Sequence, residues 1–207
     1  MRDPREEIIA VTHALDDAGM VPNKSGNVSC RVEDGFAITP AGIPYRELIT
    51  SHIVTLPLAA SEVATEPRPS SEWRMHAAIY RARPDVCAIV HTHSPRATAL
   101  AAAGRGIPPF HYMIALVGGD VRCTPYATFG TAELAESAVR GLQGRRACLL
   151  GNHGVMAIGS TLARAHAVAV EVENLADEYL SMLSAGLVPQ LLDDAEIQKV
   201  VALFADY

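Results

Sequence analysis

Three histidines and one glutamate are the residues of this chain whose types and spacing could do chemistry. His91 and His93 bracket one residue at the end of the apolar run 86–90, and His153 lies in the glycine turn 151–154. If each run is a strand, side-chain alternation places His91 and His93 on the same face, where two imidazoles can bind one ion. A third imidazole from the loop after a second strand leaves a coordination position open, which is typical of a catalytic rather than a structural zinc site. The alternative is a set of ordinary strand and turn histidines.

Glu72 is the candidate proton carrier beside such a metal. It follows Ser70 and Ser71 at the start of an expected helix. A carboxylate next to the ion can ligate it or, once a substrate displaces the carboxylate, act as an acid or base. The metal would stabilise negative charge that develops on a substrate oxygen. The alternative is that Glu72 only interacts favourably with the helix dipole. His76, one helical turn later, could orient Glu72 or be a structural histidine.

Three small polar segments could bind an anion such as a phosphate. They are Ser25-Gly26-Asn27, Thr39-Pro40-Ala41-Gly42 and Ser70-Ser71, and the last stands at a helix start. Backbone N–H groups, hydroxyls and the helix dipole together attract an anion without a cluster of cations. Each segment taken alone is also an ordinary turn signal.

Regular elements must position these residues, and the hydrophobic spacing predicts alternating helices and strands. Helices are expected over 5–18, from Glu72 to before Pro84, and over 95–103, 131–142, 161–185 and 193–204, with a helical turn at 44–48. Strands are expected over 27–32, 36–39, 53–56, 86–90, 120–124, 146–150 and 155–158, with a loop over 59–69. Thr131 and Thr161 are expected to cap their helices.

These elements predict one α/β domain over residues 1–207. The Asp34-Gly35 pair is a hairpin signal, so the first two strands should pair antiparallel. Mixed, partly antiparallel strands with helices interspersed indicate a layered domain rather than a regular βαβ array. No shift in composition indicates a domain boundary.

Composition excludes several classes of protein. The chain has 207 residues, of which 49% are hydrophobic, so it should be globular. A net charge of -6, only 17 Lys+Arg and 5% aromatic residues argue against nucleic-acid binding. No signal-like start and no apolar run of roughly 18 to 20 residues is present, so a cytoplasmic protein without membrane contact is expected. The four cysteines are far apart and should be buried free thiols: Cys30, Cys87, Cys123 and Cys148.

Together the motifs resemble the class II aldolase/adducin family, and most closely its L-fuculose-1-phosphate aldolases. The resemblance runs in order over nearly the whole chain, in segments 25–29, 38–45, 69–76, 91–93, 111–115, 125–131 and 153–154. It implies a three-layer α/β fold whose central, mixed and largely antiparallel sheet is flanked by helices on both faces. It also implies a homotetramer with active sites at the subunit interfaces.

The resemblance implies a zinc-dependent lyase that reversibly cleaves a ketose 1-phosphate, such as L-fuculose 1-phosphate, to dihydroxyacetone phosphate and an aldehyde such as L-lactaldehyde. Zn²⁺, or another divalent metal, would be held by His91, His93, His153 and Glu72, and Glu72 would leave on substrate binding to move the proton at the reacting carbon. The sugar phosphate would bind against Gly26, Asn27, Ala41, Gly42, Ser70 and Ser71.

The resemblance also assigns two tyrosines to the aldehyde side of the site. Tyr112 would reach into a neighbouring subunit and handle the proton of the aldehyde oxygen, and Tyr207 would close over the site. Lys24 and Ala41 stand where these aldolases usually have threonine, so the phosphate pocket would gain a cation and lose a hydroxyl.

Three alternatives stay open. The first is an aldolase or dehydratase acting on methylthioribulose or deoxyribulose 1-phosphate. The second is a pentulose-phosphate 4-epimerase, a class that typically has aspartate where Glu72 stands. The third is a non-catalytic interaction module like the adducin head, against which the retained histidines and Glu72 argue.

Overall fold

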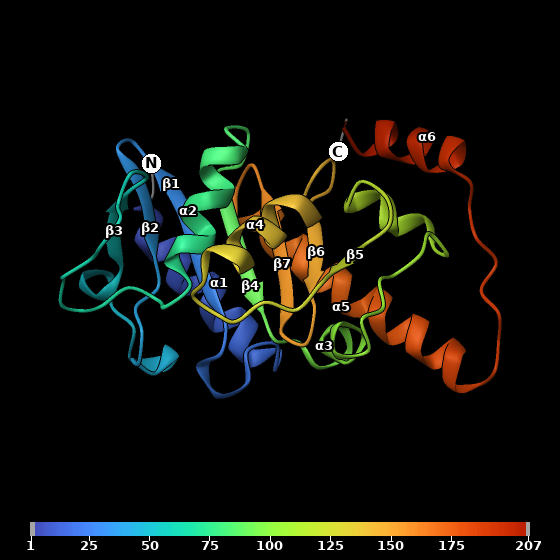
Figure 1. Ribbon diagram of the computed structural model, residues 1–207, viewed down its shortest axis with the longest axis horizontal. Helices are drawn as coiled ribbons and strands as arrows, with labels where there is room; N and C mark the ends of the chain where they lie inside the picture. The colour runs from blue at the N-terminus through green and yellow to red at the C-terminus, as the bar shows by residue number, and fades with distance from the viewer. Residues whose placement is uncertain (1–2, 206–207) are drawn as a thin grey trace.

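A seven-stranded mixed sheet runs through the computed structural model, which describes residues 3–205 (Figure 1). The strand order is β3-β2-β1-β4-β7-β6-β5. β5 pairs with β6 in parallel, and the other neighbouring pairs among the described strands are antiparallel. The strands are β1 (Asn27–Val32), β2 (Gly35–Ile38), β3 (Val54–Pro57), β4 (Ala88–Thr92), β5 (Arg122–Thr124), β6 (Ala147–Leu150) and β7 (Gly154–Gly159).

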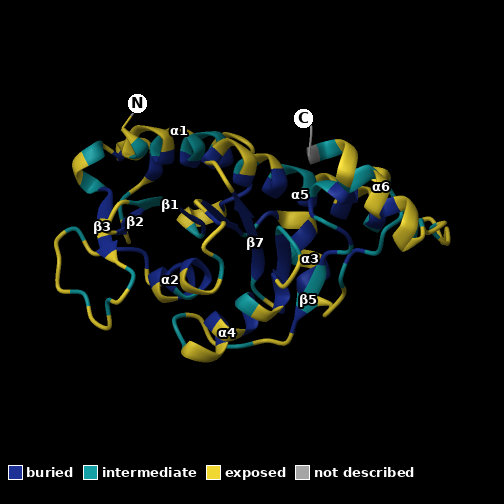
Figure 2. Cartoon of the chain, turned by 90° about the horizontal axis from the view of Figure 1, so that it is seen from above, coloured by how far each residue is buried: buried dark blue, intermediate teal, exposed yellow. Residues whose placement is uncertain are grey.

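Helices cover both faces of this sheet, as Figure 2 shows for α1 and α5 on one face and α2 and α4 on the other. The α-helices within residues 3–205 are α1 (Pro4–Asp17), α2 (Trp73–Ala82), α3 (Pro95–Ala102), α4 (Ala132–Gly141), α5 (Leu162–Ser184) and α6 (Asp194–Ala205). Short 3₁₀ turns complete the chain: η1 (Pro22–Lys24), η2 (Tyr45–Glu47), η3 (Thr50–His52) and η4 (Tyr112–Leu116). The three-layer α/β fold is therefore confirmed.

The alternation of side chains along β4 connects the two hydrophobic cores to the histidines. Val90 packs into the core below α1 and α5, whereas Ile89 packs into the core below α2 and α4. His91 is two residues after Ile89, so it points to the same face, from which the start of α2 approaches. The strand that buries the core thus also directs the first histidine toward Glu72.

Helix caps agree with the sequence prediction. The hydroxyl of Thr131 accepts a hydrogen bond from the Leu134 amide at 3.3 Å, and Thr161 accepts one from Arg164 at 3.1 Å. These contacts satisfy amides that lack a partner at a helix start. At α2 the capping residue is Glu72 itself, whose amide donates to Ser70 Oγ at 3.4 Å.

Two local predictions are wrong. The strand expected over 120–124 is shorter and covers only β5 (Arg122–Thr124). Val121 pairs with Ile107 as an isolated bridge and does not extend the strand. Cys87 is exposed rather than buried, although its neighbours Val86 and Ala88 are both buried. Cys123, also expected to be buried, is only partly buried. Cys30 and Cys148 are buried free thiols, and burial raises the pKa of Cys148 to about 12.

No helix within residues 3–205 is both long and apolar enough to cross a membrane.

Candidate active site

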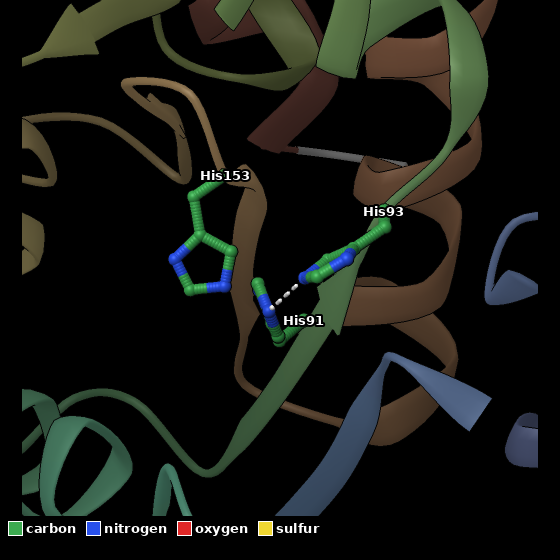
Figure 3. A group of neighbouring side chains, drawn as sticks. All are labelled: His91, His93 and His153. Atoms are coloured by element: carbon green, nitrogen blue, oxygen red, sulfur yellow. Dashed lines mark hydrogen bonds between the residues drawn. The ribbon is translucent and has the colours of Figure 1, made fainter. Parts of the chain in front are cut away.

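His91, His93 and His153 point toward one another at one end of the sheet (Figure 3). His91 lies on β4, His93 follows the strand, and His153 lies in the turn between β6 and β7. Because β7 runs antiparallel to β4, its first residues lie beside the last residues of β4. The three ring centroids are 4.9 Å apart in each pair, and Nε2 of His91 is 3.0 Å from Nε2 of His93.

Gly154 makes this convergence possible. A Cβ atom there would lie 2.4 Å from the carbonyl oxygen of Thr92 and 2.8 Å from a ring carbon of His93. Both distances are too short for any side chain larger than hydrogen. The glycine after His153 is therefore required by close packing against the end of β4.

Glu72 completes the cluster from the start of α2. Its Oε2 is 3.1 Å from His91 Nε2, and its Oε1 is 3.2 Å from His153 Nε2. The side chain is buried, and Oε1 has no hydrogen-bond partner among the described residues. The structure thus brings together all four residues that the sequence suggests as metal ligands.

The donor set fits a metal ion. His91 Nδ1 lies 2.8 Å from the Val155 carbonyl, which can only accept, so Nδ1 carries the proton and a neutral ring presents its lone pair at Nε2. That lone pair faces a Glu72 oxygen, and two acceptors about 3 Å apart need a proton or a cation between them. Tetrahedral bonds of about 2.0–2.1 Å would separate ligand atoms by about 3.3 Å, close to the 3.0, 3.1 and 3.2 Å found here.

Charges within the cluster agree with this arrangement. In the metal-free protein a proton fills the space between Glu72 and His91. Burial alone would raise the pKa of Glu72, but the charge of a protonated His91 and the hydrogen bonds from His91 and His153 outweigh burial and hold that pKa well below its ordinary range. Burial likewise lowers the pKa of His91, but Glu72 outweighs burial and raises it, so a bound cation would take the place of the shared proton. Burial and the neighbouring His91 and His153 lower the pKa of His93 to about 3. Glu72 is therefore an anion and His93 a neutral imidazole at neutral pH.

A cavity of about 390 Å³ opens onto this cluster and joins it to the polar loops. Backbone contacts bring two of the loops together: Ser70 N donates to Thr39 O at 3.0 Å, and Ala41 N donates to Arg68 O at 2.9 Å. The lining residues are Lys24, Ser25, Gly26, Asn27, Pro40, Ala41, Gly42, Ser70, Ser71, Glu72, His93, Tyr126, Ala127, Phe129, Asn152 and His153. The structure therefore brings all six expected phosphate-binding positions to one cavity.

Two lining residues add to the anion-binding character of the loops. Ser25 Oγ is buried and has no hydrogen-bond partner among the described residues. Lys24 contributes the one Lys or Arg side chain among the described lining residues, and its Nζ lies 3.4 Å from Gly42 O. A buried hydroxyl without a partner and a cation at the rim both favour a bound anion.

The structure adds a contact for Asn27 and leaves the expected roles of the two tyrosines untested. The Asn27 side chain donates to Glu72 Oε2 at 2.9 Å, so it contacts the carboxylate as well as the cavity. Tyr112 is 51% exposed on η4, beside Phe204 of α6, and does not line the cavity of its own chain. Tyr207 lies outside the described residues.

Sequence reasoning did not select the aromatic wall of the cavity, formed by Tyr126 and Phe129. Both are more than half exposed, and both lie in the loop before α4. The sequence signal was limited to the family-like segment 125–131, because exposed aromatic residues in a loop have no periodicity.

Acid should destabilise the metal-free protein between pH 6.5 and about 3. Burial, reinforced by His91, lowers the pKa of His76 to about 3 in the folded state, whereas an exposed imidazole titrates near 6.5. In this window the unfolded chain binds a proton that the folded chain does not, so stability that is complete above pH 6.5 decreases as the pH falls. Urea unfolding with a chelator, at several pH values, measures the effect. His76→Gln should show a shallower pH dependence, and an equal slope in both proteins would contradict the assignment.

Comparisons with known proteins agree with this geometry. Residues 6–180 match the family described as the Class II Aldolase and Adducin N-terminal domain. The chain is 45% identical over 207 residues to a 5-methylthioribulose-1-phosphate/5-deoxyribulose-1-phosphate aldolase of Rhodospirillum rubrum, covering 96% of this chain and 93% of the relative. It is 43% identical over 202 residues to an L-fuculose phosphate aldolase of Escherichia coli, covering 97% and 94%. A solved structure of an L-fuculose 1-phosphate aldolase superposes with a TM-score of 0.94 at 38% identity, covering 99% of this chain and 97% of that chain.

Proposed function

This chain belongs to the class II aldolase and adducin family, and we propose that it is a metal-dependent aldolase. It cleaves a ketose 1-phosphate reversibly to dihydroxyacetone phosphate and an aldehyde. The observation that carries this proposal is the Glu72 carboxylate beside His91 and His153 of the three-histidine cluster, at the cavity that the polar loops also line. An aldolase needs this combination, because one group must move a proton while positive charge stabilises the carbanion that forms.

His91, His93 and His153 would hold a divalent ion, which we expect to be zinc because imidazole donors in a tetrahedral site suit it. When bound, the ion acts as a Lewis acid and stabilises negative charge on the substrate oxygens. Glu72, a ligand before substrate binds, moves the proton. In the direction of synthesis its carboxylate takes a proton from the hydroxylated carbon of dihydroxyacetone phosphate. The electron pair left behind forms the enediolate and then the new bond to the aldehyde carbon.

The aldehyde oxygen becomes a hydroxyl in this direction and needs its own proton donor. We infer that Tyr112 of a neighbouring subunit supplies this proton, since Tyr112 is exposed and does not line the cavity of its own chain. This role of Tyr112 requires an oligomer with active sites between subunits, and we propose a homotetramer. A sizing measurement that gives a monomer would contradict both.

The substrate phosphate lies against Gly26, Ala41, Gly42, Ser70 and Ser71, with Asn27 at the boundary between phosphate and carboxylate. Lys24 stands at the rim, and we expect it to recognise the phosphate charge.

Replacing Lys24 with methionine should raise KM for the ketose phosphate about fivefold, the scale of a partly exposed charge pair, and leave kcat nearly unchanged. Steady-state kinetics at two salt concentrations measure this. Lys199→Met, which removes the other lysine of the chain, should leave KM at the wild-type value. Equal KM values for Lys24→Met and wild type would exclude a phosphate role.

Three ketose 1-phosphates compete as the physiological substrate. L-Fuculose 1-phosphate would yield L-lactaldehyde, whereas 5-methylthioribulose or 5-deoxyribulose 1-phosphate would yield a methylthio-substituted or unsubstituted acetaldehyde. The named relatives include both kinds of aldolase, at 43% and 45% identity. All three reactions release dihydroxyacetone phosphate. The same metal ligands, the same carboxylate and the same phosphate-binding residues of the protein would therefore serve each of them.

The test is to incubate the metal-loaded protein with dihydroxyacetone phosphate and a panel of short aldehydes, and to identify the ketose phosphates formed. Cleavage rates of the three ketose 1-phosphates then rank the substrates by kcat/KM. Aldol product with at least one aldehyde is expected. A protein that binds metal but forms no product with any aldehyde would exclude the aldolase proposal and favour a dehydratase or epimerase. Absence of a bound divalent ion would instead favour a non-catalytic module.

A further inference from the structure

A line of buried polar side chains leads away from Glu72 into the protein. Asn27 Nδ2 donates to Glu72 Oε2 at 2.9 Å, and Asn27 Oδ1 lies 2.5 Å from His76 Nε2. On the other side of its ring, His76 Nδ1 lies 2.7 Å from Ser29 Oγ, which lies 2.8 Å from the hydroxyl of Tyr80. Asn27 and Ser29 are on β1, and His76 and Tyr80 are on α2. All four are buried, so water does not substitute for these contacts.

Chemistry fixes the direction of every hydrogen bond in this line. The Glu72 carboxylate only accepts, so Asn27 must turn its amide nitrogen toward Glu72 and its oxygen toward His76. That oxygen also only accepts, so His76 Nε2 must carry a proton. A neutral His76 then accepts at Nδ1 from the Ser29 hydroxyl, whose oxygen accepts from Tyr80. Every donor therefore points toward Glu72.

The two oxygens of Glu72 have different surroundings as a result. Each oxygen lies close to the Nε2 atom of one proposed metal ligand, Oε2 at 3.1 Å from His91 and Oε1 at 3.2 Å from His153, but only Oε2 also accepts from Asn27 and is held in place. Oε1 has no hydrogen-bond donor among the described residues, and its near neighbour His153 Nε2 is one of the proposed metal ligands. Oε1 is thus the oxygen with a lone pair free to accept a proton.

We propose that His76 is a positioning residue for the reaction: by donating from Nε2 it fixes the Asn27 amide, which holds Glu72 Oε2 and reserves Oε1 as the atom that carries the substrate proton. The inference rests on the proposed aldolase function. Loss of the His76 donor would let the Asn27 amide turn over and leave the carboxylate misplaced, although neither His76 nor its partners beyond Asn27 line the cavity.

Two variants of His76 distinguish the effect of losing its hydrogen bond from the effect of losing the volume of its ring. Glutamine and methionine have side chains of similar length. Glutamine can donate to Asn27 from its amide, whereas methionine cannot donate. His76→Met should lower kcat roughly tenfold or more, the scale of a buried polar group left without its partner. KM and bound metal should stay within about twofold of wild type, because the three histidines and the phosphate-binding positions other than Asn27 keep their contacts. His76→Gln should recover most of kcat. Equal kcat losses in the two variants, or no loss in His76→Met, would overturn the proposal.

The tautomer of His76 is a readout that needs neither activity nor a variant that folds. Nitrogen NMR of the full-length, metal-loaded protein should show a protonated Nε2 and a bare Nδ1 for His76. The opposite tautomer would overturn the proposal whatever the enzyme does. If the expected tautomer is found but wild-type protein forms no aldol product, the proposed aldolase function is wrong. The hydrogen bonds from His76 through Asn27 would then still orient Glu72, but for a reaction other than aldol cleavage. Circular dichroism and thermal unfolding of both variants show whether a kcat loss reflects misfolding.

Discussion

Stripping the bound metal should lower the rate of aldol cleavage on the order of 10³-fold or more. A metal that polarises substrate oxygens supplies several kcal/mol of stabilisation to the developing negative charge, and about 4 kcal/mol corresponds to that factor. The Glu72 carboxylate cannot replace this effect, because it has the same sign as the charge that develops. Metal content, measured by mass spectrometry, should fall with activity during dialysis against a chelator. Addition of Zn²⁺ should restore both, and other divalent ions can then be compared.

His93→Ala is the variant that tests the same point without a chelator. His91 is fully buried and donates to Val155 O, so its replacement endangers the fold, whereas His93 is only partly buried. We expect His93→Ala to fold, to bind the metal more weakly and to lose activity to a similar extent. His166→Ala removes a partly buried histidine that lies outside the cavity and should behave like wild type. Full activity of the metal-depleted protein would refute the role of the three histidines.

Replacing Glu72 with glutamine should lower kcat roughly 10²-fold to 10⁴-fold, the usual scale of a lost proton carrier. The amide has nearly the same shape, so the three histidines should still bind the metal. What the variant lacks is an oxygen that can take up a proton, because an amide is not a base at neutral pH. Steady-state kinetics and metal analysis on the same sample separate the two effects. A glutamine variant that turns over near the wild-type rate would remove Glu72 from the mechanism.

A half-reaction makes the Glu72 test independent of the aldehyde. Dihydroxyacetone phosphate in deuterated water should exchange one hydrogen at its hydroxylated carbon in the presence of wild-type enzyme, and proton NMR follows this exchange. Glu72→Gln should lose exchange and aldol addition together. Glu72→Asp keeps a carboxylate but shortens its reach, so we expect it to retain more of both activities than the glutamine variant. Exchange at the wild-type rate in Glu72→Gln would assign proton removal to another group.

The family-like motifs and the alternation of apolar residues were sufficient to predict much of this protein. Ile89 and Val90 belong to opposite cores, as their positions in an apolar run predict, and His91 follows with the expected direction. Thr131 and Thr161 cap their helices because a cap depends on residues only three apart. Such features are local, so the sequence carries them directly.

Features that depend on distant partners could not be predicted in the same way. The strand expected over 120–124 is shorter because Val121 pairs with Ile107. Cys87 is exposed between buried Val86 and Ala88, which its place in an apolar run did not predict. The two alternatives for His76 remained open from its helical spacing alone, because its partners Asn27 and Ser29 are 49 and 47 residues away.

By itself, the sequence determined which groups are available for chemistry: three imidazoles, one carboxylate at a helix start and three small polar loops. Only the tertiary structure decided how these groups act together. It set the 3.0–3.2 Å separations that suit one ion, joined the loops to that cluster in one cavity, and gave the two oxygens of Glu72 different neighbours. The physical reason is that hydrogen-bond direction and ligand distance are properties of paired groups, and the pairs here are formed by strands and helices far apart in the chain.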